Sequence, residues 1–149
     1  MRELYNKILK ESPKCRITVF TNGYAWSSED LISWGYADKI DVLFLTIYGH
    51  NNESYYKICR TFKDGFNKIL LLNYPKMLAF SKEHNIDFRC RLNLTTAINP
   101  ITCINKVLSV LPESQSLIVS RVQEEFEISN SDYQSIKNHY KDNKRLIFY

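Results

Sequence analysis

The chain has 149 residues, of which 44% are hydrophobic and 24% are charged, so we expect one folded domain and exclude intrinsic disorder. The net charge is only +4 and the basic residues are scattered, which argues against a nucleic-acid partner. With no leader-like segment and no run of about 18 apolar residues, the sequence predicts a cytoplasmic protein that does not enter the membrane.

Five short segments rich in β-branched and aromatic residues are predicted to be strands: Ile17 to Thr21, Asp41 to Ile47, Asp87 to Leu94, Ser116 to Val122 and Arg145 to Tyr149. Helical spacing or capping residues mark the stretches between them, beginning at Ser28 and covering Asn52 to Phe62, Pro100 to Leu111 and Asp132 to Lys141. The segment from Phe66 to His84 is ambiguous, because Tyr74-Pro75 would interrupt a continuous helix. We interpret it as helical rather than as a buried strand.

Strands that alternate with helices predict a parallel sheet with right-handed crossovers, either doubly wound or of the (β/α) barrel type. No linker or repeat divides the chain, so residues 1–149 are expected to form a single α/β domain with about five mostly parallel strands. In both architectures the functional residues gather at the carboxyl ends of the strands. Polar residues at those ends are therefore the candidates for a site.

Three strand ends carry such residues. The first strand runs into Thr21-Asn22-Gly23, where Asn22 either caps the turn or directs its amide toward a ligand. The second carries Thr46 next to its last residue and is followed by Tyr48-Gly49, where glycine allows a ligand to approach or the chain to bend sharply. The fourth presents Ser120 and Arg121 ahead of the acidic pair Glu124-Glu125, which we interpret as a solvated loop or helix start.

The third strand alternates polar and apolar residues, with Arg89, Arg91 and Asn93 on one face. If that face points into a barrel, its arginines are placed to clamp a carboxylate or a phosphate. The alternative is an exposed outer face.

Neither a catalytic residue nor a metal site is predicted. The four cysteines, at positions 15, 59, 90 and 103, are far apart, and Cys90 and Cys103 fit apolar core positions. The three histidines do not adjoin a Ser or Cys nucleophile in the sequence.

The order ITVFTNG, ADKIDVLFLTIYG, ESYYKIC and EHNIDFRCRLNLT resembles the middle to C-terminal part of the radical S-adenosylmethionine superfamily barrel. The resemblance implies a partial TIM-type barrel, with S-adenosylmethionine as a possible cofactor. It also implies that Thr46 and Arg91 or Asn93 approach the ribose or methionyl part of that molecule. The cofactor-binding residues expected on this basis are Thr21, Asn22, Thr46, Tyr48, Arg91 and Asn93.

The family's chemistry is the reductive cleavage of S-adenosylmethionine to a 5′-deoxyadenosyl radical, which acts on a substrate that the sequence does not identify. The family's CxxxCxxC loop, which holds a [4Fe-4S] cluster, is absent here, so the chain resembles a truncated barrel that is not expected to perform the reaction alone. Open strand edges leave three alternatives: the barrel is completed by a partner chain or by self-association, the chain collapses into a doubly wound sheet, or it belongs to a larger assembly. The alternatives are a non-catalytic binding or interaction module and an unrelated doubly wound domain.

Overall fold

A computed structural model of the chain describes residues 2–33, 35–121 and 127–149. Its helices and strands alternate in the order α1 (Arg2–Glu11), β1 (Ile17–Thr21), α2 (Ser28–Ser33), η1 (Ala37–Lys39), β2 (Ile40–Ile47), α3 (Asn52–Cys59), η2 (Asn67–Asn73), α4 (Tyr74–Glu83), β3 (Asp87–Leu94), α5 (Pro100–Val110), β4 (Leu117–Arg121), α6 (Asn130–His139) and β5 (Leu146–Phe148). The predicted α/β class is confirmed.

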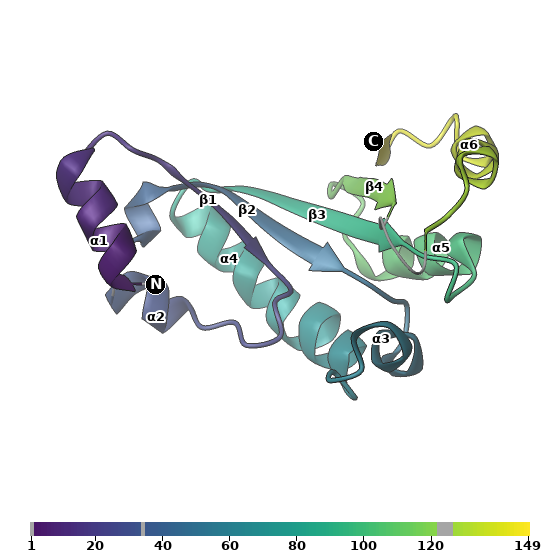
Figure 1. The fold of residues 1–149 in the computed structure, drawn as a ribbon, viewed down its shortest axis with the longest axis horizontal. Coiled ribbons are helices and arrows are strands. Elements are labelled where there is room, and N and C mark those ends of the chain that lie inside the picture. Colours follow the sequence, from purple (N-terminus) through teal and green to yellow (C-terminus); the bar gives the residue numbers. More distant parts are fainter. Residues whose placement is uncertain (1, 34, 122–126) are drawn as a thin grey trace.

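The five strands form one parallel sheet in the order β1-β2-β3-β4-β5, so each strand pairs with its neighbours in the chain (Figure 1). A doubly wound sheet reverses its strand order at a switch point, and this sheet has no such reversal among the described residues. Sequential order is the winding of a (β/α) barrel. Because β1 and β5 lie at opposite edges of the sheet, the described strands form an open, partial version of that architecture.

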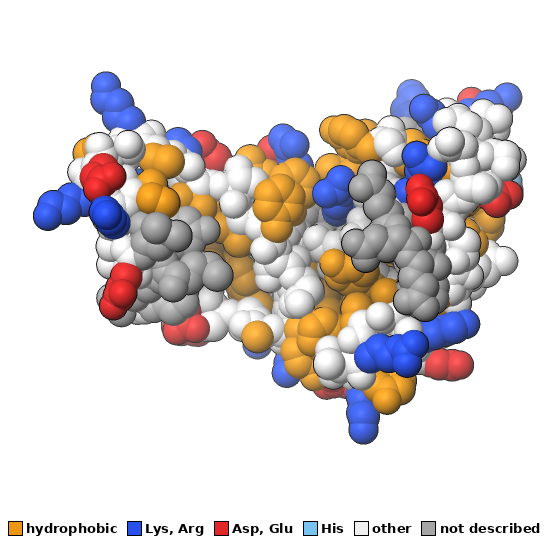
Figure 2. Space-filling view, in the orientation of Figure 1, with side chains coloured by type: hydrophobic (Ala, Val, Ile, Leu, Met, Phe, Trp, Pro, Cys, Tyr) orange, Lys and Arg blue, Asp and Glu red, His pale blue; other side chains and the backbone are white. Residues whose placement is uncertain are grey.

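The surface mixes charges of both signs. On the face shown in Figure 2, basic and acidic side chains are interspersed, as their scatter along the sequence predicts. Among the described residues, no helix is both long enough and apolar enough to span a bilayer.

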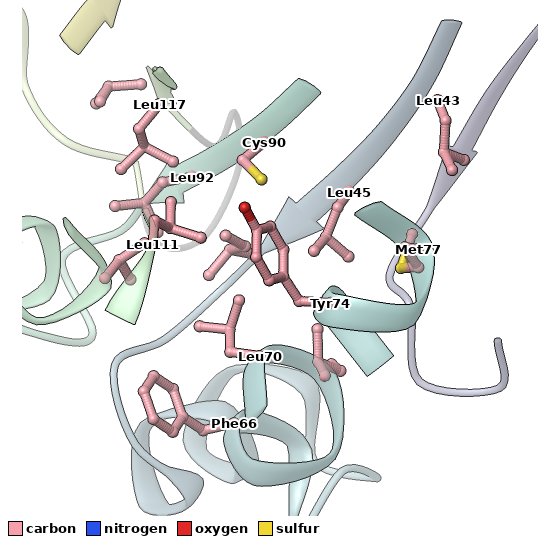
Figure 3. Packing of buried hydrophobic residues seen from close by; sticks show 14 of the residues in the cluster. Leu43, Leu45, Phe66, Leu70, Tyr74, Met77, Cys90, Leu92, Leu111 and Leu117 are labelled. Carbon is pink, nitrogen blue, oxygen red and sulfur yellow. The ribbon is translucent and has the colours of Figure 1, made fainter. Parts of the chain in front are cut away.

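Helices cover one face of the sheet, and the hydrophobic core lies between the two layers. Leu43, Leu45 and Leu92 are fully buried on this face. Figure 3 shows Tyr74 of α4 directed toward Cys90 of β3, Met77 of α4 on the side of Leu43 and Leu45 of β2, and Leu111 beside Leu92. Burial of such side chains is the main source of folding free energy, so the helix-covered face provides most of the stability.

The segment from Phe66 to His84 is helical, as predicted, but it changes type at its centre. Residues Asn67–Asn73 form a wide π-helical turn, in which the Tyr74 amide donates to the carbonyl of Ile69, and α4 follows. Pro75 lacks an amide proton and its ring would clash with the carbonyl four residues earlier in a continuous α-helix. The wider turn accommodates the proline at the start of α4, so the Tyr-Pro pair changes the helix without ending it.

Polar caps fix the start of three helices. Asn51 and Ser54 form a reciprocal capping box at α3, Asn99 caps α5 ahead of Pro100, and the side chain of Ser129 caps α6. α3 ends at Cys59, three residues before the predicted end, because Arg60 adopts a left-handed conformation with φ of 55°. β4 ends at Arg121, while Val122 and the acidic pair Glu124-Glu125 lie outside the described residues.

Candidate functional site

The face of the sheet opposite the helices carries the polar candidates. Side chains alternate along each strand, so the covered Cys90, Leu92 and Leu94 of β3 place Arg91 and Asn93 on the other face. In the register of the sheet Arg91 pairs with Thr46 of β2, and Asn93 pairs with Ser120 of β4. Polar side chains from three adjacent strands therefore lie side by side on this face, toward the carboxyl end of the sheet. We call it the helix-free face, because no helix of the described residues covers it.

A chain of hydrogen bonds links these side chains. The Arg91 Nε donates to the Ser120 Oγ at 3.0 Å, and the Ser120 hydroxyl donates to the Asn93 Oδ1 at 2.8 Å. Burial raises the pKa of the Tyr48 phenol and the thiol of Cys59 adds to the rise, while a hydrogen bond from Asn93 and the charge of Arg91 oppose it. Arg91, Asn93 and Ser120 thus form one hydrogen-bonded network beside Tyr48, and we call these four residues the polar network.

The two arginines of β3 differ in their partners. Arg89 forms an ion pair with Asp87, two residues earlier on its own strand, and its guanidinium lies 5.6 Å from the ring centre of Phe44. Within the described residues Arg91 has no carboxylate partner, and only its Nε is engaged, by a neutral hydroxyl. A guanidinium fork with free N–H groups is the preferred ligand for carboxylates and phosphates. Arg91 is therefore the anion-binding group that this face offers.

Thr21 and Asn22 have a different local role. The Thr21 Oγ1 accepts from the Gly23 amide and the Asn22 Oδ1 accepts from the Tyr24 amide, both at 3.0 Å, so the two oxygens cap the turn after β1. Gly23 has φ of 71°, and a Cβ there would lie 2.7 Å from the Leu45 Cδ1. Of the two uses considered for Asn22, the structure shows the turn cap.

A buried asparagine fixes this turn to the helical layer. The Asn73 Nδ2, at the end of the π-helical turn, donates to the carbonyls of Gly23 at 2.7 Å and Tyr24 at 3.3 Å. Asn73 is buried, so these bonds form away from water, where an unsatisfied carbonyl is costly. The turn that follows β1 is thereby held in one position relative to the sheet.

The glycine after Tyr48 serves the backbone. A Cβ on Gly49 would lie 2.5 Å from the Ser54 Oγ and 2.9 Å from the Tyr55 amide nitrogen, so glycine lets the chain pass closely against the start of α3. The close approach allowed by Gly49 is thus to the protein's own helix, and it fixes where β2 leads into α3.

The cysteines do not fit an iron-sulfur cluster. No group of three or more Cys, His, Asp or Glu side chains among the described residues is arranged to hold a metal ion. Burial raises the pKa of Cys90 and of Cys103 to about 12, which opposes the thiolate form that cluster ligands adopt. The described cysteines therefore form no ligand set for such a cluster.

Two hollows lie outside the polar network. One of about 630 Å³ lies between the loop after β3 and α6, and its lining includes Ile98, Ile136 and His139. Another of about 490 Å³ lies over the amino-terminal half of β3 to β5, and its lining includes Arg89 and Ile147. Neither contains any of the six predicted site residues. We base the site on the polar network because its donors converge on one strip of the sheet.

Four of the six predicted cofactor-binding residues share the helix-free face: Thr46, Tyr48, Arg91 and Asn93. Ser120 was noticed in the sequence as a polar residue at a strand end but was not assigned to the site. The pairing of Asn93 with Ser120 depends on strand register, which a single sequence does not provide. Asn73 was also missed, since nothing in its helical surroundings points to a turn 50 residues away.

In comparisons with known proteins, the sequence matches no protein-family model and no curated protein.

Proposed function

We propose that this chain is part of a radical S-adenosylmethionine type barrel, and that its helix-free sheet face binds S-adenosylmethionine or a close analogue. The observation that carries the proposal is the polar network, in which Arg91 lies on a helix-free face with no carboxylate partner in the described part of the chain. The sequential strand order supports it, because in a (β/α) barrel the face away from the helices is the inner wall.

The residues of the network match the chemistry of the ligand. The Arg91 guanidinium is suited to the methionyl carboxylate, and the Asn93 amide is suited to ribose hydroxyls, as is the hydroxyl of Thr46, which lies outside the network but pairs with Arg91 in the sheet register. The proposal concerns binding and orientation of the ligand. Its cleavage requires an iron-sulfur cluster, which the described cysteines do not fit, so no reaction step is assigned to this chain.

The test is calorimetric titration of S-adenosylmethionine into the wild-type chain and into two variants, Arg91→Gln and Arg89→Gln. The second variant is a matched control, because Arg89 lies two residues away on the same strand and is already paired with Asp87. We expect Arg91→Gln to weaken binding at least about tenfold, the loss typical of a charged hydrogen bond, and Arg89→Gln to bind like the wild type. Absence of binding to the wild type, or equal affinity in all three proteins, would refute the proposal.

A second candidate function is that of an interaction module that pairs with another chain. It is favoured by the open edge of the sheet at β5, where Ile147 is 44% exposed and Tyr149 is 72% exposed. Light scattering over a concentration series tests this candidate. Concentration-dependent association that is lost in Tyr149→Ser would support it, and a monomer at all concentrations would count against self-pairing.

A further inference from the structure

An aromatic pair lies on the same helix-free face as the polar network. Phe20 of β1 and Phe44 of β2 stack with ring centroids 4.8 Å apart and planes inclined by 7°. The Phe20 side of the pair is the accessible one, since Phe20 is 62% exposed and Phe44 is half-buried. A stacked aromatic pair with one accessible side presents a flat apolar surface onto which a further ring can stack.

The cation nearest to this pair is neutralised. The Arg89 guanidinium lies over Phe44, but Asp87 pairs with it, so its charge is compensated on its own strand. The next uncompensated guanidinium among the described residues of this face is that of Arg91. Flat apolar surface and anion-binding charge are therefore separated along the face, the first over β1 and β2 and the second over β3.

The register of the sheet sets the distance between the accessible ring of Phe20 and the charge of Arg91. Phe20 pairs with Phe44, Phe44 pairs with Arg89, and Arg91 follows two residues along β3. Phe20 and Arg91 are therefore two strands apart across the sheet and two residues apart along the strand direction. This offset places their Cα atoms about 12 Å apart. A planar base joined through a sugar to a short chain ending in a carboxylate is long enough to reach both points.

In Figure 2 hydrophobic and basic side chains lie next to one another across the middle of the molecule.

Resting on the proposed function, we propose that Phe20 and Arg91 form a two-point site that orients a nucleoside bearing an anionic chain, with its base on Phe20 and its anionic group on Arg91. This arrangement favours molecules that combine a flat ring with an anionic group over molecules that carry only one of the two. It also fixes their direction, with the ring toward β1 and the anion toward the middle of the sheet. The base is held by stacking, so the site tolerates different purines.

The experiment measures the affinities of S-adenosylhomocysteine, adenosine and methionine for the wild-type chain and for Phe20→Ala, Phe20→Tyr and Arg91→Gln. S-adenosylhomocysteine carries both groups, adenosine lacks the carboxylate, and methionine lacks the ring. We expect Phe20→Ala to weaken both adenine-containing ligands about tenfold while Phe20→Tyr restores them. We expect Arg91→Gln to weaken the binding of the two ligands that carry a carboxylate, S-adenosylhomocysteine and methionine, and to leave the binding of adenosine unchanged.

The outcomes separate this inference from the proposed function. One outcome is that Arg91→Gln weakens the binding of S-adenosylhomocysteine while Phe20→Ala binds it like the wild type. The aromatic part of the site is then refuted and the proposed function stands. If none of the three ligands binds the wild-type chain, both are refuted. If Phe20→Ala changes only the oligomeric state, measured by light scattering, Phe20 belongs to a contact between chains and the two-point site is refuted.

Discussion

The two faces of the sheet use the same strands for different purposes. On β3 the side chains of Cys90, Leu92 and Leu94 are at most 1% exposed beneath the helices, whereas Arg91 and Asn93 on the opposite face engage other polar groups. Alternation along a strand makes this possible without any change in backbone. The covered face therefore determines stability, and the helix-free face is available for binding.

The largest expected difference between the faces concerns stability. Leu92→Ala removes a fully buried side chain and leaves a cavity, so we expect a loss of about 3 kcal/mol in the free energy of unfolding, measured with urea. Leu72→Ala is the matched control, because Leu72 is 53% exposed, and it should cost less than about 0.5 kcal/mol. Equal losses in the two variants would contradict the assignment of the covered face.

The turn after β1 tests how firmly the helical layer holds that turn. Asn73→Ala leaves the carbonyls of Gly23 and Tyr24 without their buried donor, so we expect a loss of about 2 kcal/mol in urea unfolding. Asn67→Ala changes an exposed asparagine in the same π-helical segment and should have little effect. If both variants unfold at the same urea concentration, Asn73 does not hold the turn.

A third test uses pH. Burial raises the pKa of Cys90 and of Cys103 from 9.0 to about 12, so the folded protein retains two thiol protons that the unfolded chain releases. Their contribution to stability is fully present below about pH 9 and is lost as the pH rises toward 12, by up to about 1.4 kcal/mol per pH unit for each thiol.

Urea unfolding at several alkaline pH values measures this slope, and Cys103→Ala should make it shallower. An unchanged slope would show that the thiol of Cys103 titrates alike in the folded and unfolded states. The charge of an ionised Cys103 also adds to the raised pKa of Tyr55 and Tyr140, so the change in slope includes the response of these two tyrosines to its removal.

The smallest expected effect is on the stability of the helix-free face. Arg91→Gln removes a charge that has no carboxylate partner among the described residues, and glutamine retains a donor for Ser120. We expect a change below about 0.5 kcal/mol in urea unfolding. A loss as large as that of Leu92→Ala would mean that Arg91 is primarily structural.

The sequence predicted much of this comparison because alternation is a local signal. The bounds of β1 and β3, the covered position of Cys90 and the shared face of Arg91 and Asn93 all follow from a period of two residues. The partners of those residues could not be predicted in the same way. Joining Ser120 to Asn93 requires the strand register, and joining Asn73 to Gly23 requires the packing of a helix against a turn far away in the sequence.

The π-helical turn also escaped prediction, since the apolar pattern around Ile69 fits several kinds of helix as well as a strand. Tyr74-Pro75 indicated an interruption at the correct place, but its effect depends on whether the preceding turn can widen. The turn cap formed by the Asn22 Oδ1, one of the two uses considered for this residue, likewise became evident only from the geometry of the turn.

The most direct test of the helix-free face as a binding surface is a nuclear magnetic resonance titration of the ¹⁵N-labelled chain with S-adenosylmethionine. We predict that the amide signals of Thr46, Arg91, Asn93 and Ser120 shift as the ligand is added, while those of the distant α1 do not. Shifts confined to the helices, or no shifts at millimolar ligand, would contradict the account.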